Sequence, residues 1–203
     1  MESFSHSKPS HFLVLSTILV LLYLNIIVTV SAHTDNTTTT ESFIKSSCAV
    51  TLYPKVCIES LSPYSDYIQT SSLALVNAAL NATLKGSQET LNIISELSKG
   101  KNLGHREAEA ISDCVENLKD SVYELQDGMI QMKDIDGNDF QEKMLNVLTW
   151  VSAALTDEDT CMDGFEGDEM DVKIKSSIGI NIFKVAQLTS NALALIKSIS
   201  TST

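Results

Sequence analysis

The segment HREAEAISDCVENLKDSVYELQDGMIQM, residues 105–132, decides the fold. Its apolar residues recur every three or four positions, at Ala108, Ile111, Cys114, Leu118, Val122, Leu125, Met129 and Met132. Because an α-helix turns once in 3.6 residues, this spacing places all eight along one side. The segment therefore predicts an amphipathic helix that buries one apolar stripe.

Three further stretches, residues 66–99, 139–155 and 175–199, are predicted to be helical, and the last two repeat this period. None contains proline, and the alternation typical of β-strands is not sustained anywhere in the chain. Short connections make successive helices antiparallel. The sequence therefore predicts an all-α fold, with residues 63–203 forming an up-and-down four-helix bundle.

A short helical hairpin is predicted ahead of the bundle, at residues 41–62, with Pro54 in the first turn of its second arm. We expect the hairpin and the bundle to form a single domain over residues 41–203. Residues 33–40, HTDNTTTT, predict a flexible polar segment before it.

Composition excludes some classes of function. The chain has 203 residues and a formal charge of −12, with 14 basic against 26 acidic residues. Nucleic-acid binding requires clustered lysine and arginine, and Arg106 is the single arginine. A hydrophobic content of 43% is too high for a disordered chain and sufficient for a core.

The first 32 residues have the pattern of a secretory signal peptide. Residues 12–30 are almost wholly apolar, and small residues follow them up to Ala32, where we expect cleavage. The alternative is an uncleaved membrane anchor, which polar residues inside the apolar run disfavour. We expect a secreted, extracellular protein that is not membrane-bound after cleavage and keeps the charge of −12.

Four cysteines, Cys48, Cys57, Cys114 and Cys161, predict two disulfides in an oxidising compartment, with three possible connectivities. Zinc ligation competes poorly, because no pair has C-x-x-C spacing. Cys48 and Cys57 lie one on each hairpin arm. In an antiparallel bundle Cys114 is level with about residue 157, close to Cys161. We therefore prefer Cys48–Cys57 and Cys114–Cys161.

Two sequons accompany the secretory signal, and they make Asn36 and Asn81 candidate glycosylation sites.

The excess acid is concentrated in residues 105–171, which hold 19 acidic and 4 basic residues. Residues 172–203 hold no acidic residue and four basic ones. In the predicted helix at residues 105–132, acidic residues form a stripe opposite the apolar one, at Asp113, Glu116, Asp120, Glu124 and Asp127. Like charges at this spacing disfavour a helix. The stripe is consistent with a solvated face or with a docking surface for a basic partner. In either case the Asn117 side chain would add hydrogen bonds.

Little in the sequence indicates catalysis or metal binding. The acidic segment after Asp157 does not match the ligand and glycine positions of a calcium loop, so we expect no metal and no cofactor. After signal cleavage His105 is the one internal histidine, and it resembles a helix-start residue. We expect a protein that is not an enzyme, with no catalytic residue. Trp150 is predicted to pack inside the bundle.

Three segments resemble the plant invertase and pectin methylesterase inhibitors. They are the Cys48-x8-Cys57 pair with Tyr53-Pro54 inside it, AISDCVENLKD at residues 110–120, and WVSAALTDEDTCMDGF at residues 150–165. The resemblance spans the mature chain. It implies a hairpin before a four-helix bundle, sequential disulfides, and a non-catalytic protein that forms a stoichiometric complex with a cell-wall enzyme.

The resemblance also implies the site. Inhibitors of this kind cover the pectin-binding cleft of pectin methylesterase with the surface around the second disulfide. The matching positions are Glu116, Asp120, Thr160 and Asp163, and neighbouring residues extend the set: Asp113, Asn117 and Glu124.

The expected partner is pectin methylesterase in the cell wall or apoplast, bound 1:1 by a monomer. A Pro-Lys-Phe tripeptide, often found in invertase-directed members, is missing from the sequence, and the segment after Trp150 is more similar to the pectin methylesterase side. An invertase inhibitor, cell-wall or vacuolar, is the alternative, and a non-inhibitory structural or signalling cell-wall protein is a third.

Overall fold

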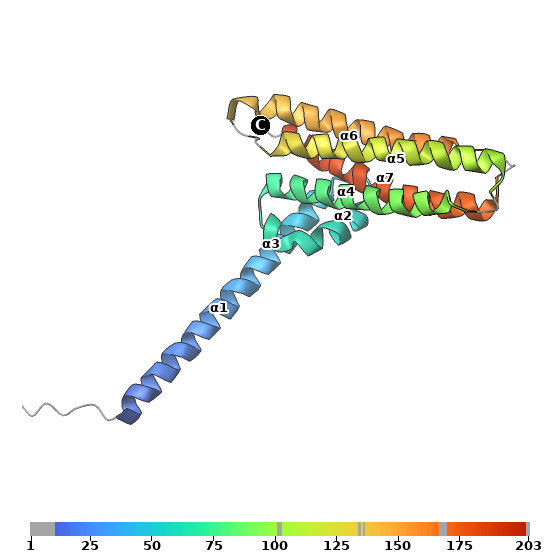
Figure 1. The fold of residues 1–203 in the computed structure, drawn as a ribbon. Coiled ribbons are helices and arrows are strands. Elements are labelled where there is room, and N and C mark those ends of the chain that lie inside the picture. The colour runs from blue at the N-terminus through green and yellow to red at the C-terminus, as the bar shows by residue number, and fades with distance from the viewer. Residues whose placement is uncertain (1–10, 101–102, 134, 136, 167–169, 202–203) are drawn as a thin grey trace, which may run out of the picture.

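The computed structural model describes residues 11–100, 103–133, 135, 137–166 and 170–201, and its regular structure there is helical, with no strand. Four long helices follow residue 70: α4 (Ser72–Leu97), α5 (His105–Met132), α6 (Phe140–Asp163) and α7 (Val172–Ser200). Neighbours in sequence pack together and α4 also packs on α7, which closes a ring of four. In Figure 1, α5 and α6 lie side by side above α4 and α7. The predicted all-α, up-and-down four-helix bundle is confirmed.

The bundle core has two clusters of buried apolar side chains. One contains Cys114, Cys161 and Phe165 at the end where α6 finishes, and the other lies toward the hairpin around Leu80, Met144 and other residues. On α5 the predicted apolar stripe is buried over most of its length, although Met129 is half-buried and Ala108 is exposed, so the stripe begins at residue 110 or 111.

The N-terminal helix is longer than expected. α1 runs from His11 to Cys48 and projects from the bundle as a rod in Figure 1. Residues 33–40, expected to be a flexible polar segment, lie within α1, and Thr40 is buried. Residues 33–40 contain neither proline nor glycine, so this segment has no helix-breaking residue. Within the described residues, no helix is both long and apolar enough to cross a membrane.

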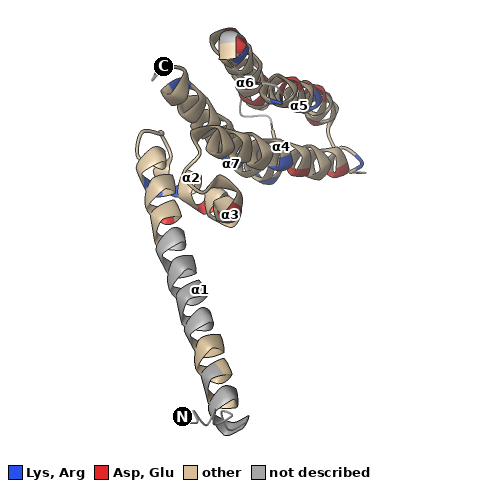
Figure 2. Cartoon of the chain, turned by 90° about the vertical axis from the view of Figure 1, so that its left-hand side faces the viewer, with Lys and Arg blue, Asp and Glu red and all other residues tan. Residues whose placement is uncertain are grey.

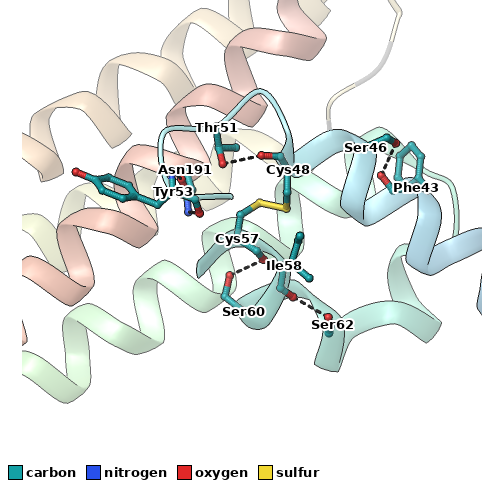
Figure 3. Close-up of a disulfide and its surroundings, with 10 residues drawn as sticks. All are labelled: Phe43, Ser46, Cys48, Thr51, Tyr53, Cys57, Ile58, Ser60, Ser62 and Asn191. Carbon is teal, nitrogen blue, oxygen red and sulfur yellow. Dashed lines mark hydrogen bonds between the residues drawn. A yellow bond between two sulfur atoms is a disulfide. The ribbon is translucent and has the colours of Figure 1, made fainter. Parts of the chain in front are cut away.

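The hairpin consists of the end of α1, α2 (Pro54–Leu61), the 3-10 turn η1 (Ser62–Tyr64) and α3 (Ser65–Ile68). The Cys48–Cys57 disulfide joins α1 to α2. The loop between them is fixed to α7 by Asn191, which accepts a hydrogen bond from the Tyr53 backbone N–H (3.1 Å) and donates one to its C=O (3.0 Å). In Figure 3, Asn191 lies against Tyr53, beside the Cys48–Cys57 disulfide.

Two predicted helix bounds are wrong. The stretch 66–99 breaks after Ile68, because Gln69 adopts a positive φ of 48° and Ser71 then caps α4 by accepting a hydrogen bond from the Ala74 N–H. The stretch 139–155 begins after the 3-10 turn η2 (Gly137–Asp139) and continues to Asp163 instead of ending at residue 155. Cys161 therefore lies on α6 itself, and not in the loop after it.

Candidate docking surface

Helix α5 displays most of the candidate side chains. It begins where the Gly104 N–H donates to the Glu107 carboxylate (2.8 Å), and its apolar stripe anchors it to the bundle, which leaves the opposite side to solvent. Glu116 and Asp120 are exposed, as is Asp113, while Asn117 is half-buried. Of the acids in the predicted stripe on α5, these three and Asp127 are thus exposed at the surface.

Helix α6 contributes the two remaining positions. Thr160 and Asp163 are exposed near its end, and the Thr160 hydroxyl donates to the Thr156 C=O (2.7 Å). The Cys114–Cys161 disulfide joins α5 to α6 with a Cα–Cα distance of 4.2 Å. Since α5 and α6 are antiparallel, the four positions flank one covalent link.

Glu116, Asp120, Thr160 and Asp163 are thus exposed on α5 and α6 near this disulfide, and we name these four candidate residues the docking surface. Asp120 lies about 9 Å along α5 from the disulfide, at 1.5 Å of rise per residue, so the four positions span little more than two helical turns. In Figure 2, acidic residues lie along α5 and α6, and others lie on α4.

Glu124 differs from the other candidates, because it is half-buried against Asp157 of α6. Burial, followed by the charge of Asp157, raises the pKa of Glu124 to about 7, and burial also raises the pKa of Asp157. One oxygen of each carboxyl is buried without a donor among the described residues, so the two can hydrogen-bond only by sharing a proton. In mildly acidic solution Glu124 is then neutral.

Two large aromatic side chains accompany the acids. Tyr123 on α5 is 65% exposed, and Trp150 on α6 is 37% exposed, so the prediction that Trp150 packs inside the bundle is wrong. Trp150 lies where α6 meets α5. A Cβ added to Gly128 of α5 would be 3.6 Å from the Trp150 Cβ.

The remaining candidates from the sequence are the two glycosylation sites and His105. Asn81 is exposed on α4 and donates to the Asn77 C=O (2.8 Å), whereas the hydroxyl of its sequon partner Thr83 is buried. The side chain of Asn36 lies outside the part of the chain that the structure describes. His105 is exposed, with Nδ1 3.1 Å from the Glu109 carboxylate.

Two polar residues in the bundle carry structural roles that the sequence analysis missed. Glu158 is fully buried among hydroxyl groups, and Asn191 is 3% exposed. A signal existed for Glu158: it continues the buried period of α6, at spacings of four after Ala154 and three before Cys161.

Chemically, the arrangement on α5 and α6 can attract a basic surface by charge, with aromatic side chains beside the acids. Among the described residues, no three histidine, cysteine, aspartate or glutamate side chains gather as metal ligands would.

Comparisons with known proteins agree with this geometry. The model of the family described as plant invertase/pectin methylesterase inhibitor matches residues 42–195. The chain is 46% identical over 159 residues to the "21 kDa protein" of Daucus carota, covering 77% of this chain and 82% of that protein. It is 41% identical to pectinesterase inhibitor 11 of Arabidopsis thaliana, over 77% of this chain and 80% of the relative.

A solved structure supports the fold independently. The crystal structure of a mutant form of a pectin methylesterase inhibitor from Arabidopsis superposes with a TM-score of 0.60, covering 74% of this chain and 92% of that one, at 22% identity. Because the family model matches most of its length, the chain belongs to the plant invertase/pectin methylesterase inhibitor family.

Proposed function

We propose that this protein is a secreted inhibitor of pectin methylesterase. It forms a 1:1 complex in which the docking surface covers the pectin-binding cleft and so limits the de-esterification of cell-wall pectin. The observation that carries the proposal is the exposed acidic surface beside the second disulfide, in a chain whose relatives at about 40% identity are named pectinesterase inhibitors.

Charge supports a docking role for this surface over a merely solvated face. Among the described residues, ion pairs join Lys55 to Glu59, Lys85 to Glu89, Lys99 to Glu96 and His105 to Glu109. None of these pairs uses Asp113, Glu116 or Asp120. A run of exposed acids without cationic partners raises the local negative potential, which steers a basic partner toward it.

Rigidity supports the same role. The disulfide holds α5 and α6 together at the docking surface, and buried residues from both helices lie directly beneath it. Because the surface is built on helices and not on loops, its side chains lose little freedom when a partner binds. Such a surface can cover a cleft without rearranging.

The remaining parts of the proposal concern the environment of the protein. Two disulfides and the predicted signal peptide favour an oxidising, extracellular compartment, namely the cell wall or apoplast. Asn36 and Asn81 would carry N-glycans added during secretion. The chain acts as a monomer, without metal or cofactor, and is not an enzyme.

Charge reversal tests the docking surface. In the double variant Glu116→Lys/Asp120→Lys we expect inhibition of pectin methylesterase to weaken at least several-fold, because two attractive charges become repulsive. The matched control Glu41→Lys/Asp66→Lys makes the same change in net charge at exposed acids of α1 and α3. The proposed surface is refuted if both double variants inhibit equally well while circular dichroism shows both folded.

The same family also contains invertase inhibitors, as its description states. A preparation that inhibits an invertase and leaves pectin methylesterase unaffected would assign the docking surface to that target. Inhibition of neither enzyme would favour a structural or signalling protein of the cell wall.

A further inference from the structure

Glu158 is a carboxyl group at the centre of the four-helix bundle, on α6, with no exposed surface. Its oxygens lie within hydrogen-bond distance of three hydroxyl groups that are themselves fully buried: Ser87 of α4 (3.3 Å), Ser121 of α5 (3.1 Å) and Thr189 of α7 (2.8 Å). One side chain therefore connects all four long helices through polar contacts, inside an otherwise apolar core.

Counting hydrogens shows which form of the carboxyl suits this site. The Thr189 hydroxyl lies near both the Glu158 carboxyl and the Val185 C=O (3.1 Å), yet it has one hydrogen to donate. If Glu158 is protonated, its O–H donates to the Thr189 oxygen, and Thr189 donates to Val185. The Ser87 hydroxyl, which also has one hydrogen, lies in the same way between the Glu158 carboxyl (3.3 Å) and the Thr83 C=O (3.2 Å). If Glu158 is ionised, Thr189 must turn to the carboxylate and leaves the Val185 carbonyl without that hydrogen.

The surroundings supply no positive charge. From α4, α5 and α7 the groups that face Glu158 are the three hydroxyls, and the charged residue of the described chain that acts on it is Asp159 of its own helix. Burial is the largest cause that raises the pKa of Glu158, to about 7, and Asp159 adds to it, while the hydroxyls oppose the shift.

We propose that Glu158 is a proton-operated lock of the bundle: when protonated it ties the four helices together, and its ionisation loosens them. A carboxylate buried without a counter-charge is destabilising, whereas a neutral, fully hydrogen-bonded carboxyl is tolerated. The contribution of Glu158 to stability is therefore greatest in mildly acidic surroundings and declines as the pH rises toward neutrality. This conclusion concerns the fold and holds whichever partner the docking surface binds.

The sign and size follow from proton linkage. In the unfolded chain Glu158 loses its proton near pH 4.5, and in the folded chain near pH 7. Between these values the folded state holds one proton more, so the folding constant falls about tenfold per pH unit. Over the whole interval the loss from this one group approaches roughly 300-fold, which is about 3 kcal/mol.

The test compares urea unfolding of the wild type with that of Glu158→Gln at several values between pH 4.5 and 8, disulfides intact. Glutamine keeps the shape and the hydrogen bonds but cannot ionise. We expect the ratio of the wild-type folding constant to that of the variant to fall by up to roughly 300-fold across this range. A ratio that stays constant with pH overturns the proposal.

A matched control is Glu142→Gln, at an exposed acid in the first turn of the same helix. Its ratio to the wild type should not change appreciably with pH. If Glu158→Gln does not fold, NMR of the wild type labelled with carboxyl-13C glutamate gives the answer directly. One glutamate besides Glu124, assigned to Glu158, should titrate near pH 7, and titration of Glu158 below pH 5 overturns the lock.

Discussion

The contact between the hairpin and the bundle depends on Asn191. Its buried amide accepts a hydrogen bond from the Tyr53 N–H and donates one to the Tyr53 C=O, at 3.1 and 3.0 Å. Asn191→Ala removes both bonds. The Tyr53 carbonyl keeps a second partner, the Cys57 N–H at 3.0 Å, but the Tyr53 N–H is left without its acceptor.

The size of the effect follows from these contacts. Each lost hydrogen bond is worth about 1 kcal/mol net, and the part-buried Tyr53 N–H that loses its acceptor adds a further penalty of up to about 1 kcal/mol. We therefore expect Asn191→Ala to lower the free energy of unfolding by about 2–3 kcal/mol. If the hairpin opens locally, amide exchange at Tyr53 should accelerate about 30- to 150-fold, since 1.4 kcal/mol corresponds to a factor of ten.

Urea unfolding and hydrogen exchange measure these two quantities. The matched control is Asn181→Ala on the same helix, since the Asn181 amide donates only within α7, to the Ser177 C=O at 2.8 Å. It should change stability by less than about 0.5 kcal/mol, because alanine favours helix. An Asn191→Ala variant as stable as the Asn181→Ala variant would refute the assigned role.

Two further predictions concern covalent and steric features of the bundle. Replacing Cys114 and Cys161 by serine opens a link with a sequence separation of 47 and should cost about 4 kcal/mol of unfolding free energy, against about 2.5 kcal/mol for the hairpin link with a separation of 9. A larger loss from the shorter link, measured by urea unfolding, would contradict this order. Gly128→Ala should stabilise the protein by about 0.5–1 kcal/mol, because its new Cβ meets neighbours at ordinary distances of 3.5 Å and beyond. Gly86→Ala should gain less, since Leu188 Cδ1 at 2.9 Å must move, and thermal unfolding of the two variants would expose a reversed order.

The bundle could be predicted because its apolar periodicity is strong and uninterrupted. On α5 the predicted and observed bounds are both 105–132, since a long amphipathic pattern needs no knowledge of its neighbours. The second disulfide followed from the antiparallel arrangement of α5 and α6. The exposed acidic stripe could also be located from the sequence, because it lies opposite the buried stripe.

The parts that escaped prediction depend on tertiary contacts. The end of α6 lies eight residues beyond the predicted one, and it includes Glu158, an acid that hydroxyl groups from three other helices accommodate inside the bundle. The proton shared by Glu124 and Asp157 arises where two helices meet, and neither helix alone reveals it.

The most direct test of the account is to titrate one purified preparation against a pectin methylesterase and an acid invertase, in mildly acidic buffer. The account predicts that pectin methylesterase activity declines to its floor at one mole of this protein per mole of enzyme, while the invertase keeps its activity. Loss of invertase activity with an unaffected pectin methylesterase would contradict it, and so would full activity of both enzymes.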